Sequence, residues 1–233
     1  MGLGPGKRDL LTPRALKAIQ EADLIIAYKT YLPFFEDLII EQEVISSGMR
    51  KEMERAQAAV DEASKGKNVV VVSSGDPGVY GMAGLVLQTA GEIPVEIVPG
   101  VTAATTAAAL LGAPLMHDFA VISLSDLLTP WAAIQLRLEA AAQADFIVVL
   151  YNPRSKGRPN QMETARQILL RHKEELTPVG IVRAAERGQE TVLITTLRDM
   201  PMEVIDMQTT VIVGNSQTIA DNGRMITPRG YLL

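Results

Sequence analysis

The stretch from Ser73 to Gly81 contains the residue types that can hold a small ligand. It follows the apolar run 69–72, and a helical pattern resumes at Met82. A buried strand that ends in Gly-Asp-Pro-Gly places bare backbone and one carboxylate at the carboxyl edge of a sheet, where open α/β proteins bind ligands. The glycines let a ligand approach the main chain, and Asp76 can accept hydrogen bonds from its hydroxyl or N–H groups. A plain strand-to-helix connection is the alternative interpretation.

A second glycine-rich stretch, Gly2-Leu3-Gly4-Pro5-Gly6, lies at the start of the chain. A dinucleotide-binding fingerprint requires Gly-x-Gly-x-x-Gly after a strand, with an acidic residue about 20 positions later. Asp23 meets the last condition, but Pro5 disrupts the spacing and no strand precedes Gly2. The alternative is a disordered terminus, which the helix start at Thr12-Pro13 disfavours because it provides a capping hydroxyl and a proline at the first helical position.

Strands and helices alternate along the chain, which predicts an α/β protein. Gly112-Ala113-Pro114 interrupts the pattern, so we predict two α/β domains, residues 1–112 and 115–233. The predicted elements of the first half are strands 24–27, 69–73 and 95–98 and helices from 13, over 49–65, over 82–90 and up to 111. Those of the second half are strands 119–123, 146–150, 178–182, 191–196 and 209–213 and helices over 131–142 and from 160.

The two halves predict different sheets. The first half predicts a mainly parallel sheet. In the second half, strands 191–196 and 209–213 are close enough in sequence to pair antiparallel, so we expect a mixed sheet. The helix from Asn160 begins with Asn-x-x-Glu, which predicts a variant of the capping box with Glu163.

Composition excludes several classes of function. The net charge is −5, which disfavours nucleic acid as a partner, because phosphate contacts require clustered Lys and Arg. The chain has no cysteine and only two histidines, so we expect no disulfide and no metal site. No apolar run approaches the length of about 20 residues that crosses a bilayer, and the N-terminus is not a secretion signal. We therefore expect a soluble cytoplasmic protein without a membrane partner.

Together these motifs resemble the tetrapyrrole methylase superfamily, whose members use S-adenosylmethionine. The glycine-rich start, the Ser-Gly-Asp-Pro turn and the Pro-Gly-Val-Thr-Ala segment 99–103 occur in that family's order. The resemblance is closest to the precorrin-3B C-17-methyltransferase branch of cobalamin biosynthesis and covers nearly the whole chain. The stretches that indicate this branch are 28–31, 73–83, 117–127, 150–156, 213–216 and 227–231.

One feature departs from the family. Members have a β-strand before the Gly-Pro-Gly loop, and no such strand precedes Gly2 here. We therefore expect a late translation start or a truncated chain, with a destabilised first sheet, a loosened loop at Pro5 and an activity that depends on how far the fold tolerates the loss.

The resemblance implies a cofactor cleft between the two domains, with S-adenosylmethionine as the cofactor. Matching the family's motifs position by position implies one set of cofactor-binding residues: Pro5, Gly75, Asp76, Val79, Thr102, Ala103, Asn152 and Ala185, the last from the least secure match.

The implied substrate is a tetrapyrrole with many carboxylate arms. Arg154, Lys156 and Arg158 follow a predicted strand and can pair with such arms, although a solvated loop is the alternative. Tyr28 and Tyr31 can stack on the macrocycle; equally, they can be core or interface residues.

The implied activity is methylation of C-17 of precorrin-3B or cobalt-precorrin-3 with ring contraction, in a homodimer. His117 and Asp118 are candidates for acid–base help because they lie in the expected linker. A sister corrin methyltransferase acting at another ring carbon and a non-catalytic corrinoid-binding homologue are the alternatives, and a dinucleotide oxidoreductase is a distant third. The sequence does not reveal whether the substrate carries cobalt.

Overall fold

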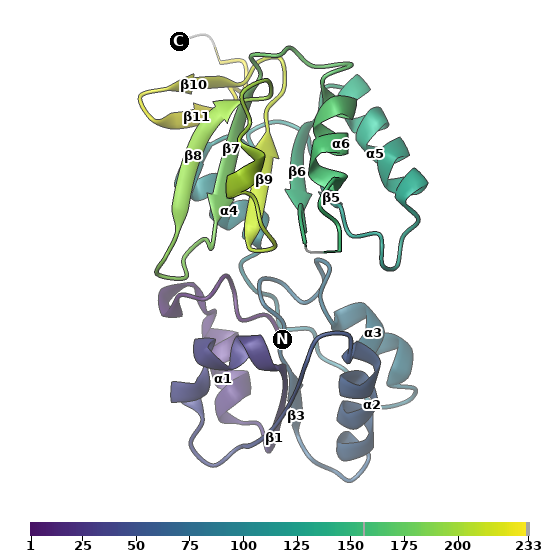
Figure 1. Cartoon of the computed structure of the whole chain (residues 1–233). Helices are drawn as coiled ribbons and strands as arrows, with labels where there is room; N and C mark the ends of the chain where they lie inside the picture. The colour runs from purple at the N-terminus through teal and green to yellow at the C-terminus, as the bar shows by residue number, and fades with distance from the viewer. Residues whose placement is uncertain (156, 232–233) are drawn as a thin grey trace. The chain divides into compact units, whose positions relative to one another are not determined.

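The computed structural model describes residues 1–155 and 157–231 and divides the chain into two compact units, Met1–Ala103 and Ala104–Leu233 (Figure 1). The division falls before the long Ala-rich helix, whereas the sequence placed the boundary after it, at 112–115. The helix belongs to unit 2 because Ala104, Ala107 and Leu111 are buried against that unit's sheet. Each unit is an α/β structure, as the sequence predicted.

Unit 1 is built around a three-stranded parallel sheet of order β2-β1-β3. Thr12 caps its first helix as predicted, since the Thr12 hydroxyl accepts a hydrogen bond from the Ala15 amide at 3.1 Å. The elements of unit 1 are η1 (Arg8–Leu10), α1 (Pro13–Gln20), β1 (Leu24–Tyr28), η2 (Lys29–Phe34), η3 (Glu36–Leu38), β2 (Glu43–Ser47), α2 (Glu52–Ala63), β3 (Val69–Val71) and α3 (Ala83–Thr89).

Both faces of this sheet are covered. Ile25 and Val70 pack in a core that includes Ile19 of α1, whereas Leu24 and Val69 point the other way and pack with Ala59 of α2. Alternate residues of a strand face opposite sides, so a strand covered on both faces must be apolar throughout. This explains why β1 and β3 are continuous apolar runs.

Residues Met1–Gly4 continue the sheet beside β3. Gly2 forms a parallel bridge with Ser73, and Gly4 exchanges two backbone hydrogen bonds with Gly75, at 3.1 and 2.7 Å. On its other side Gly2 donates to the Val98 carbonyl at 2.9 Å. The buried Pro5 therefore follows a segment that is hydrogen-bonded on both sides.

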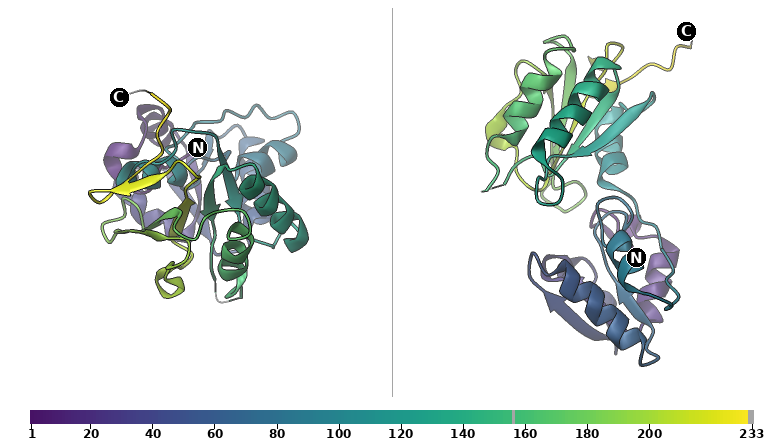
Figure 2. Two further views of the ribbon diagram at one scale, coloured as in Figure 1. Left: turned by 90° about the horizontal axis from the view of Figure 1, so that it is seen from above. Right: turned by 90° about the vertical axis from the view of Figure 1, so that its right-hand side faces the viewer.

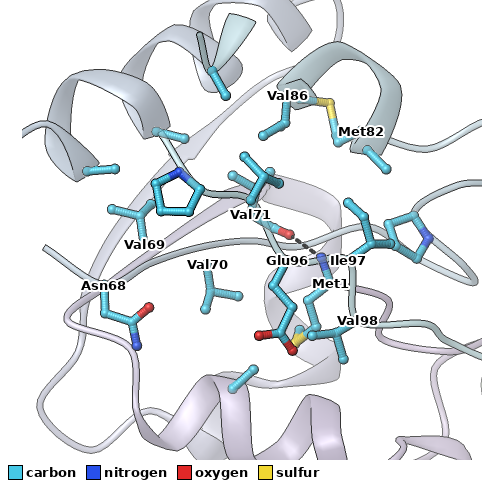
Figure 3. A pocket seen from close by; sticks show the side chains of 18 of the residues that line it. Met1, Asn68, Val69, Val70, Val71, Met82, Val86, Glu96, Ile97 and Val98 are labelled. Carbon is cyan, nitrogen blue, oxygen red and sulfur yellow. Dashed lines mark hydrogen bonds between the residues drawn. The ribbon is translucent and has the colours of Figure 1, made fainter. Parts of the chain in front are cut away.

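The strand that the sequence predicted over 95–98 is not formed, although Val98 is buried. A strand requires a bonded neighbour along its length, and this segment has one only at Val98, where Gly2 reaches it. Residues 95–97 line a cavity instead (Figure 3).

The N-terminal amine of Met1 is buried and donates to the Val71 carbonyl at 2.9 Å. Burial lowers the pKa of this amine to about 6, and the Asp76 carboxylate opposes that shift. Between pH 6 and pH 8 the unfolded chain therefore binds a proton that the folded chain has released, so stability rises with pH across this window.

We expect a gain of up to about 2 kcal/mol in the free energy of unfolding between pH 6 and pH 8, as two pKa units correspond to about 2.7 kcal/mol. Urea denaturation at a series of pH values measures it. An N-terminally acetylated chain is the control and should lack this step; the same pH dependence in both proteins would refute the assignment to Met1.

Unit 2 contains a five-stranded mixed sheet and a small three-stranded sheet. Its elements are α4 (Ala103–Leu111), β4 (Gly112–Ala113), β5 (Phe119–Ser123), α5 (Trp131–Gln143), β6 (Ile147–Tyr151), α6 (Gln161–Leu169), β7 (Pro178–Arg183), β8 (Thr191–Thr196), η4 (Met202–Val204), β9 (Thr209–Val213), β10 (Ile219–Asp221) and β11 (Arg224–Ile226).

The larger sheet has the order β5-β6-β9-β7-β8 and is mixed, as predicted. Strands β5 and β6 are parallel, and β9 runs antiparallel to both β6 and β7. The predicted pairing of 191–196 with 209–213 is wrong, because β7 lies between β8 and β9. The prediction was based on the short sequence separation between 191–196 and 209–213. In the structure the fully buried β9 lies at the centre of the sheet and the more exposed β8 lies at its edge.

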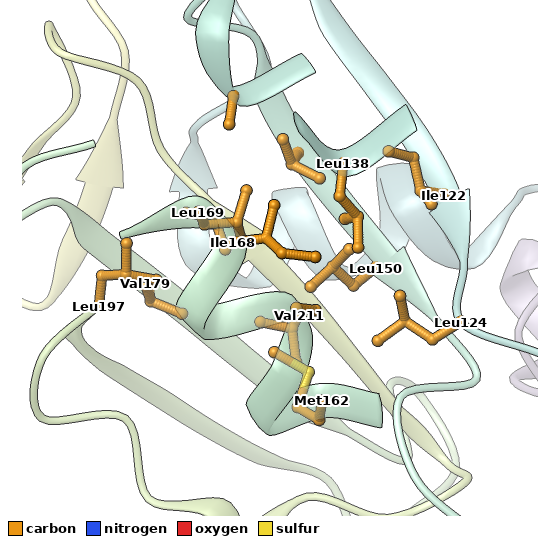
Figure 4. Close-up of a cluster of buried hydrophobic side chains, with 14 of the residues drawn as sticks. Ile122, Leu124, Leu138, Leu150, Met162, Ile168, Leu169, Val179, Leu197 and Val211 are labelled. Carbon is orange, nitrogen blue, oxygen red and sulfur yellow. The ribbon is translucent and has the colours of Figure 1, made fainter. Parts of the chain in front are cut away.

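Helices cover both faces of the larger sheet (Figures 1 and 2). Val148 and Leu150 point to the side of α5 and α6, where they join a large apolar cluster (Figure 4). Ile147 and Val149 point to the other side and pack with α4. This two-sided burial makes β6 the continuous β-branched run that the sequence identified.

Gly180 of β7 lies against the side chain of Leu111 in α4. A Cβ atom at Gly180 would lie 2.2 Å from one methyl carbon of the fully buried Leu111. We expect Gly180→Ala to cost about 1–3 kcal/mol of stability in chemical denaturation, because the fully buried Leu111 side chain must move within a packed core. In a Leu111→Ala background the same substitution should cost little; an equal cost in both backgrounds would contradict the contact.

The predicted capping box at the start of α6 is not formed. The Asn160 side chain makes no capping hydrogen bond, and the Glu163 carboxylate binds Arg166 and Gln167 on its own helix. The Arg166 guanidinium, one helical turn away, binds the Glu163 carboxylate in place of the capping contact.

None of the helices in the described part of the chain combines the length and apolar character that spanning a membrane requires.

Candidate functional site

Three glycines from distant parts of the sequence meet in unit 1. A Cβ atom at Gly100 would lie 2.2 Å from the Gly75 carbonyl oxygen and 2.9 Å from the Gly2 Cα. One at Gly2 would lie 2.4 Å from the same oxygen. The three main chains therefore touch directly, which only residues without a side chain allow. We call this contact the glycine junction; it joins the N-terminal loop, the Gly-Asp-Pro turn and the Pro-Gly segment.

Asp76 ties two of these loops together. One carboxylate oxygen accepts from the Gly78 amide at 2.8 Å within the turn, and the other accepts from the Gly100 amide at 3.0 Å. The sequence predicted that Asp76 would bind a ligand directly. Each oxygen accepts one backbone hydrogen bond and keeps a second lone pair, so Asp76 holds the loop at Gly100 in place and can still accept a hydrogen bond from a ligand.

The turn residues and the Pro-Gly segment present their backbone side by side. Gly75 has φ +63°, and a Cβ there would lie 3.7 Å from Thr102 Cα and 3.8 Å from the Ala103 nitrogen, with nothing closer. Thr102 and Ala103 are half-buried, as is Val79 across the turn. The Gly75 amide and carbonyl are bonded to Gly4 and the Val79 amide to the Asp76 carbonyl, so this surface offers a nucleoside cofactor close packing against main chain that carries little side chain. The residues present therefore fit S-adenosylmethionine.

Tyr28 and Tyr31 lie beside the same edge of the sheet. Tyr28 ends β1, and its neighbour Ile26 is in register with Val71 of β3, so Tyr28 is level with Ser73. The two rings pack edge to face, with centroids 5.2 Å apart, and the Arg55 guanidinium lies 5.7 Å from the Tyr28 centroid. Both tyrosines are half-buried, and Tyr31 also packs against the core.

In unit 2 Asn152 follows β6 at the carboxyl end of the parallel pair β5–β6. Its φ is +52°, an unfavourable region for a residue with a side chain. The side-chain amide nitrogen of Asn152 donates to the hydroxyl of Ser123, at the end of β5, over 2.9 Å. Asparagine adopts this region more readily than most residues with a side chain, so the φ value alone does not assign a role, and the cofactor contact of Asn152 stays a prediction.

Tyr151, which the sequence did not single out, bonds to the helix that follows the Pro-Gly segment. Its hydroxyl accepts a hydrogen bond of 2.6 Å from the Ala104 amide in the first turn of α4. First-turn amides have no partner within their helix, so this bond positions the start of α4. The tyrosine directly before Asn152 was the available signal, but nothing local indicated its partner.

A second strained position adjoins Ala185. Ala184, at the end of β7, has φ +49° and its amide donates to the Gln208 carbonyl at 3.0 Å. Glu186 also has a positive φ of +57°. The half-buried Ala185 lies between two strained residues, which is consistent with a constrained loop at this position.

The structure describes two of the three predicted substrate-binding cations, Arg154 and Arg158, and their surroundings differ. Arg158 is buried and its guanidinium donates to the Leu124 carbonyl at 3.0 Å, so it holds the loops of unit 2 together. Arg154 is half-buried and donates to the Met202 carbonyl at 2.7 Å. Lys156 lies outside the described residues.

We expect Arg158→Ala to lower stability rather than substrate affinity, by about 2–3 kcal/mol, because it leaves a buried carbonyl without its donor. Chemical denaturation of this variant beside Arg154→Ala measures the difference. A stability loss for Arg154→Ala equal to that of Arg158→Ala would contradict the assignment.

His117 and Asp118 lie away from the other candidates of unit 2. The Asp118 carbonyl accepts from the Ile147 amide at the beginning of β6, and Asn152 follows the end of that strand. The two ends are about 16 Å apart at the usual rise per residue. The structure therefore does not bring His117 and Asp118 to Asn152, and their proximity in sequence to the expected linker was a poor guide to their position.

Residues 1–201 match the family described as tetrapyrrole (corrin/porphyrin) methylases. The chain belongs to the tetrapyrrole methylase family. The Gly-Asp-Pro turn and the Pro-Gly segment both lie within the matched residues. The order of the two α/β units also agrees with this membership.

Two relatives are similar over the whole chain. A protein of Priestia megaterium named cobalt-factor III methyltransferase is 51% identical over 99% of this chain and 44% of its own length. A protein of Salmonella typhimurium named probable cobalt-factor III C(17)-methyltransferase is 48% identical over 100% of this chain and 98% of its own length. The chain thus spans less than half of the length of the Priestia protein and nearly the whole length of the Salmonella protein.

Solved structures of the family have the same fold. The methyltransferase CobJ superposes with a TM-score of 0.91 at 38% identity, over 97% of both chains. The cobalt precorrin-4 methyltransferase CbiF superposes with a TM-score of 0.75 at 28% identity, over 92% of both chains. The predicted two-unit tetrapyrrole methylase fold is therefore confirmed.

Proposed function

We propose that this tetrapyrrole methylase transfers a methyl group from S-adenosylmethionine to C-17 of cobalt-factor III or a closely related cobalt-precorrin-3, with ring contraction, in cobalamin biosynthesis. The observation that carries the proposal is the 48% identity along the full length of the Salmonella relative, whose name specifies that carbon. The high similarity to CobJ supports it. The relatives' names favour the cobalt-bearing substrate over metal-free precorrin-3B.

Methyl transfer from a sulfonium needs alignment of the methyl group with the accepting carbon more than it needs chemical help from side chains. We assign cofactor contacts to the backbone of Gly75, Val79 and the Thr102–Ala103 segment in unit 1, with Pro5 beside them. Asn152 and Ala185 provide contacts from unit 2. Asp76 both positions the Gly100 loop and contacts the cofactor through the lone pairs that its oxygens keep.

We assign substrate contacts to Tyr28, Tyr31 and Arg154. The edge-to-face tyrosine pair offers an apolar surface of the kind on which a macrocycle stacks. A guanidinium pairs well with a carboxylate arm. Arg158 is left out because its buried side chain is engaged by backbone carbonyls.

The test is turnover with a methyl-labelled donor. Purified protein is incubated with labelled S-adenosylmethionine and either cobalt-factor III or metal-free precorrin-3B, and NMR of the product locates the label. We expect the label at C-17 with the cobalt substrate. Label at another ring carbon would favour a sister methyltransferase, and macrocycle binding without turnover would favour a corrinoid-binding homologue.

The proposal includes a homodimer and a cytoplasmic location. Sedimentation at micromolar concentration tests the first, with a single monomeric species as the contradicting result. Cell fractionation with an antibody tests the second, and recovery of the protein with the membranes or the medium would refute it.

A further inference from the structure

Two exposed basic side chains of unit 1, Lys29 and Arg50, differ from the others in their surroundings. With the residues that the structure describes, neither forms an ion pair or a side-chain hydrogen bond. Each remaining lysine and arginine of unit 1 forms an ion pair with an aspartate or glutamate; these are Lys7, Arg8, Arg14, Lys17, Lys51, Arg55, Lys65 and Lys67. A cation without a carboxylate beside it can attract an anionic ligand.

Both residues lie at the carboxyl edge of the parallel sheet of unit 1. Tyr28 ends β1 and is in register with Ser47, which ends β2. Lys29 follows Tyr28 directly, and Arg50 lies three positions after Ser47. Strand β3 is parallel to β1, so the Gly-Asp-Pro turn leaves the sheet at the same edge. Open α/β sheets bind small ligands at this edge, so the position of the two cations indicates a binding role.

A buried arginine holds the two strand ends together. One terminal nitrogen of Arg55, on α2, donates to the Ser47 hydroxyl and to the Gly48 carbonyl, each at 2.9 Å. The other lies 3.2 Å from a Glu52 carboxylate oxygen, and the guanidinium lies 5.7 Å from the centroid of the Tyr28 ring. Because a planar guanidinium makes these contacts at once, the end of β1 and the loop after β2 keep a fixed relation.

The acidic residues that follow Arg50 in the sequence are already paired. Glu52 binds Arg55, and Glu54 binds Lys51, all at the start of α2. The exposed Arg50 guanidinium therefore remains available to a carboxylate from outside the chain.

We propose that Lys29 and Arg50 form a carboxylate-binding subsite for the acidic arms of the tetrapyrrole acceptor. This inference rests on the proposed function, which places the macrocycle on the edge-to-face pair of Tyr28 and Tyr31. A ring with carboxylate arms is complementary to an aromatic surface that has cations on the adjoining segments. Arg50 can bind a carboxylate through two parallel hydrogen bonds, whereas Lys29 acts as a point charge.

The test is an equilibrium titration with cobalt-factor III, followed by the absorption of the macrocycle, on the native protein and two double variants. Lys29→Gln/Arg50→Gln removes the subsite. Arg14→Gln/Lys65→Gln is the matched control, because it removes one arginine and one lysine from exposed ion pairs of the same unit. Isothermal titration with S-adenosylhomocysteine and calorimetry are carried out on all three proteins.

We expect Lys29→Gln/Arg50→Gln to weaken macrocycle binding about 30- to 100-fold, since hydrogen bonds from two charged donors are lost. Its affinity for S-adenosylhomocysteine and its melting temperature should equal those of the native protein, because both side chains are exposed. The control should bind the macrocycle as the native protein does. Added salt should weaken macrocycle binding by the native protein more than binding by Lys29→Gln/Arg50→Gln.

Native macrocycle affinity in Lys29→Gln/Arg50→Gln, or an equal loss in the control, would overturn the proposal. A parallel loss of S-adenosylhomocysteine affinity and melting temperature would also overturn it, because it would indicate a structural role. The titration requires no turnover, so a methyl label at a carbon other than C-17 would refute the proposed reaction while the expected binding difference still supported the subsite. A native protein that does not bind the macrocycle would refute both.

Discussion

Gly100→Ala should weaken cofactor binding at least about 100-fold and destabilise unit 1 by about 3 kcal/mol. The added carbon would lie 2.2 Å from the Gly75 oxygen, 2.9 Å from Gly2 Cα and 3.0 Å from the Gly2 carbonyl carbon. All three are main-chain atoms, which cannot turn aside as a side chain can, so the loops must separate. Because the cofactor contacts assigned to unit 1 lie on these loops, affinity for S-adenosylhomocysteine should fall at least about 100-fold in isothermal titration.

The matched control is Gly84→Ala. A Cβ at Gly84, within α3, meets nothing within 4 Å, and alanine favours a helix over glycine by about 1 kcal/mol. This variant should therefore bind as the native protein does and be as stable or slightly more stable. Far-UV circular dichroism distinguishes a folded Gly100→Ala protein with separated loops from an unfolded one. A folded Gly100→Ala variant with native affinity would rule out a functional role for the glycine junction.

Asp76→Ala weakens cofactor binding by about 30-fold, which corresponds to about 2 kcal/mol. The substitution removes the acceptor of the exposed Gly78 amide and of the half-buried Gly100 amide, and the half-buried amide without an acceptor costs about 1–3 kcal/mol. The cofactor affinity of Asp76→Asn should lie between those of the native protein and Asp76→Ala. The side-chain oxygen of the asparagine can still accept one hydrogen bond, while its NH2 group faces the second amide. Titration with S-adenosylhomocysteine measures all three proteins.

The control for charge is Asp61→Asn, an exposed acid on α2 whose carboxylate binds the Gln57 amide of the same helix. It changes the net charge by the same amount as Asp76→Asn and should leave affinity unchanged. Native affinity in Asp76→Ala would show that the Gly100 loop is held without the carboxylate. Equal losses in Asp76→Asn and Asp61→Asn would instead indicate a long-range charge effect.

Much of unit 2 could be predicted from the chain alone. The runs that became β6 and β9 are apolar and β-branched, and such runs indicate strands buried on both faces. Which strand pairs with which could not be read in this way. Strand β8 follows β7 and precedes β9, but it pairs with β7 only, because β9 is paired with β6 and β7.

The candidate site shows the same division. The types of Gly75, Asp76 and Asn152 and their places after strands indicated a site, and the structure puts strained or closely packed backbone there. The predicted substrate contact of Arg158 is not supported, because its side chain is buried and donates to the Leu124 carbonyl. The sequence pattern of a cation after a strand does not distinguish this arrangement from a solvent-facing side chain. For His117, neither type nor neighbours indicated its distance from the carboxyl end of β6.

The sequence by itself determined the alternation of strands and helices, the Thr12 cap of α1 and the family motifs, since each depends on residues within a few positions of one another. Only the tertiary structure decided that Gly2, Gly75 and Gly100 touch and that Asp76 accepts from the Gly100 amide. The physical reason is that contacts between distant segments depend on strand order, register and the burial of both partners, and local residue patterns do not specify these.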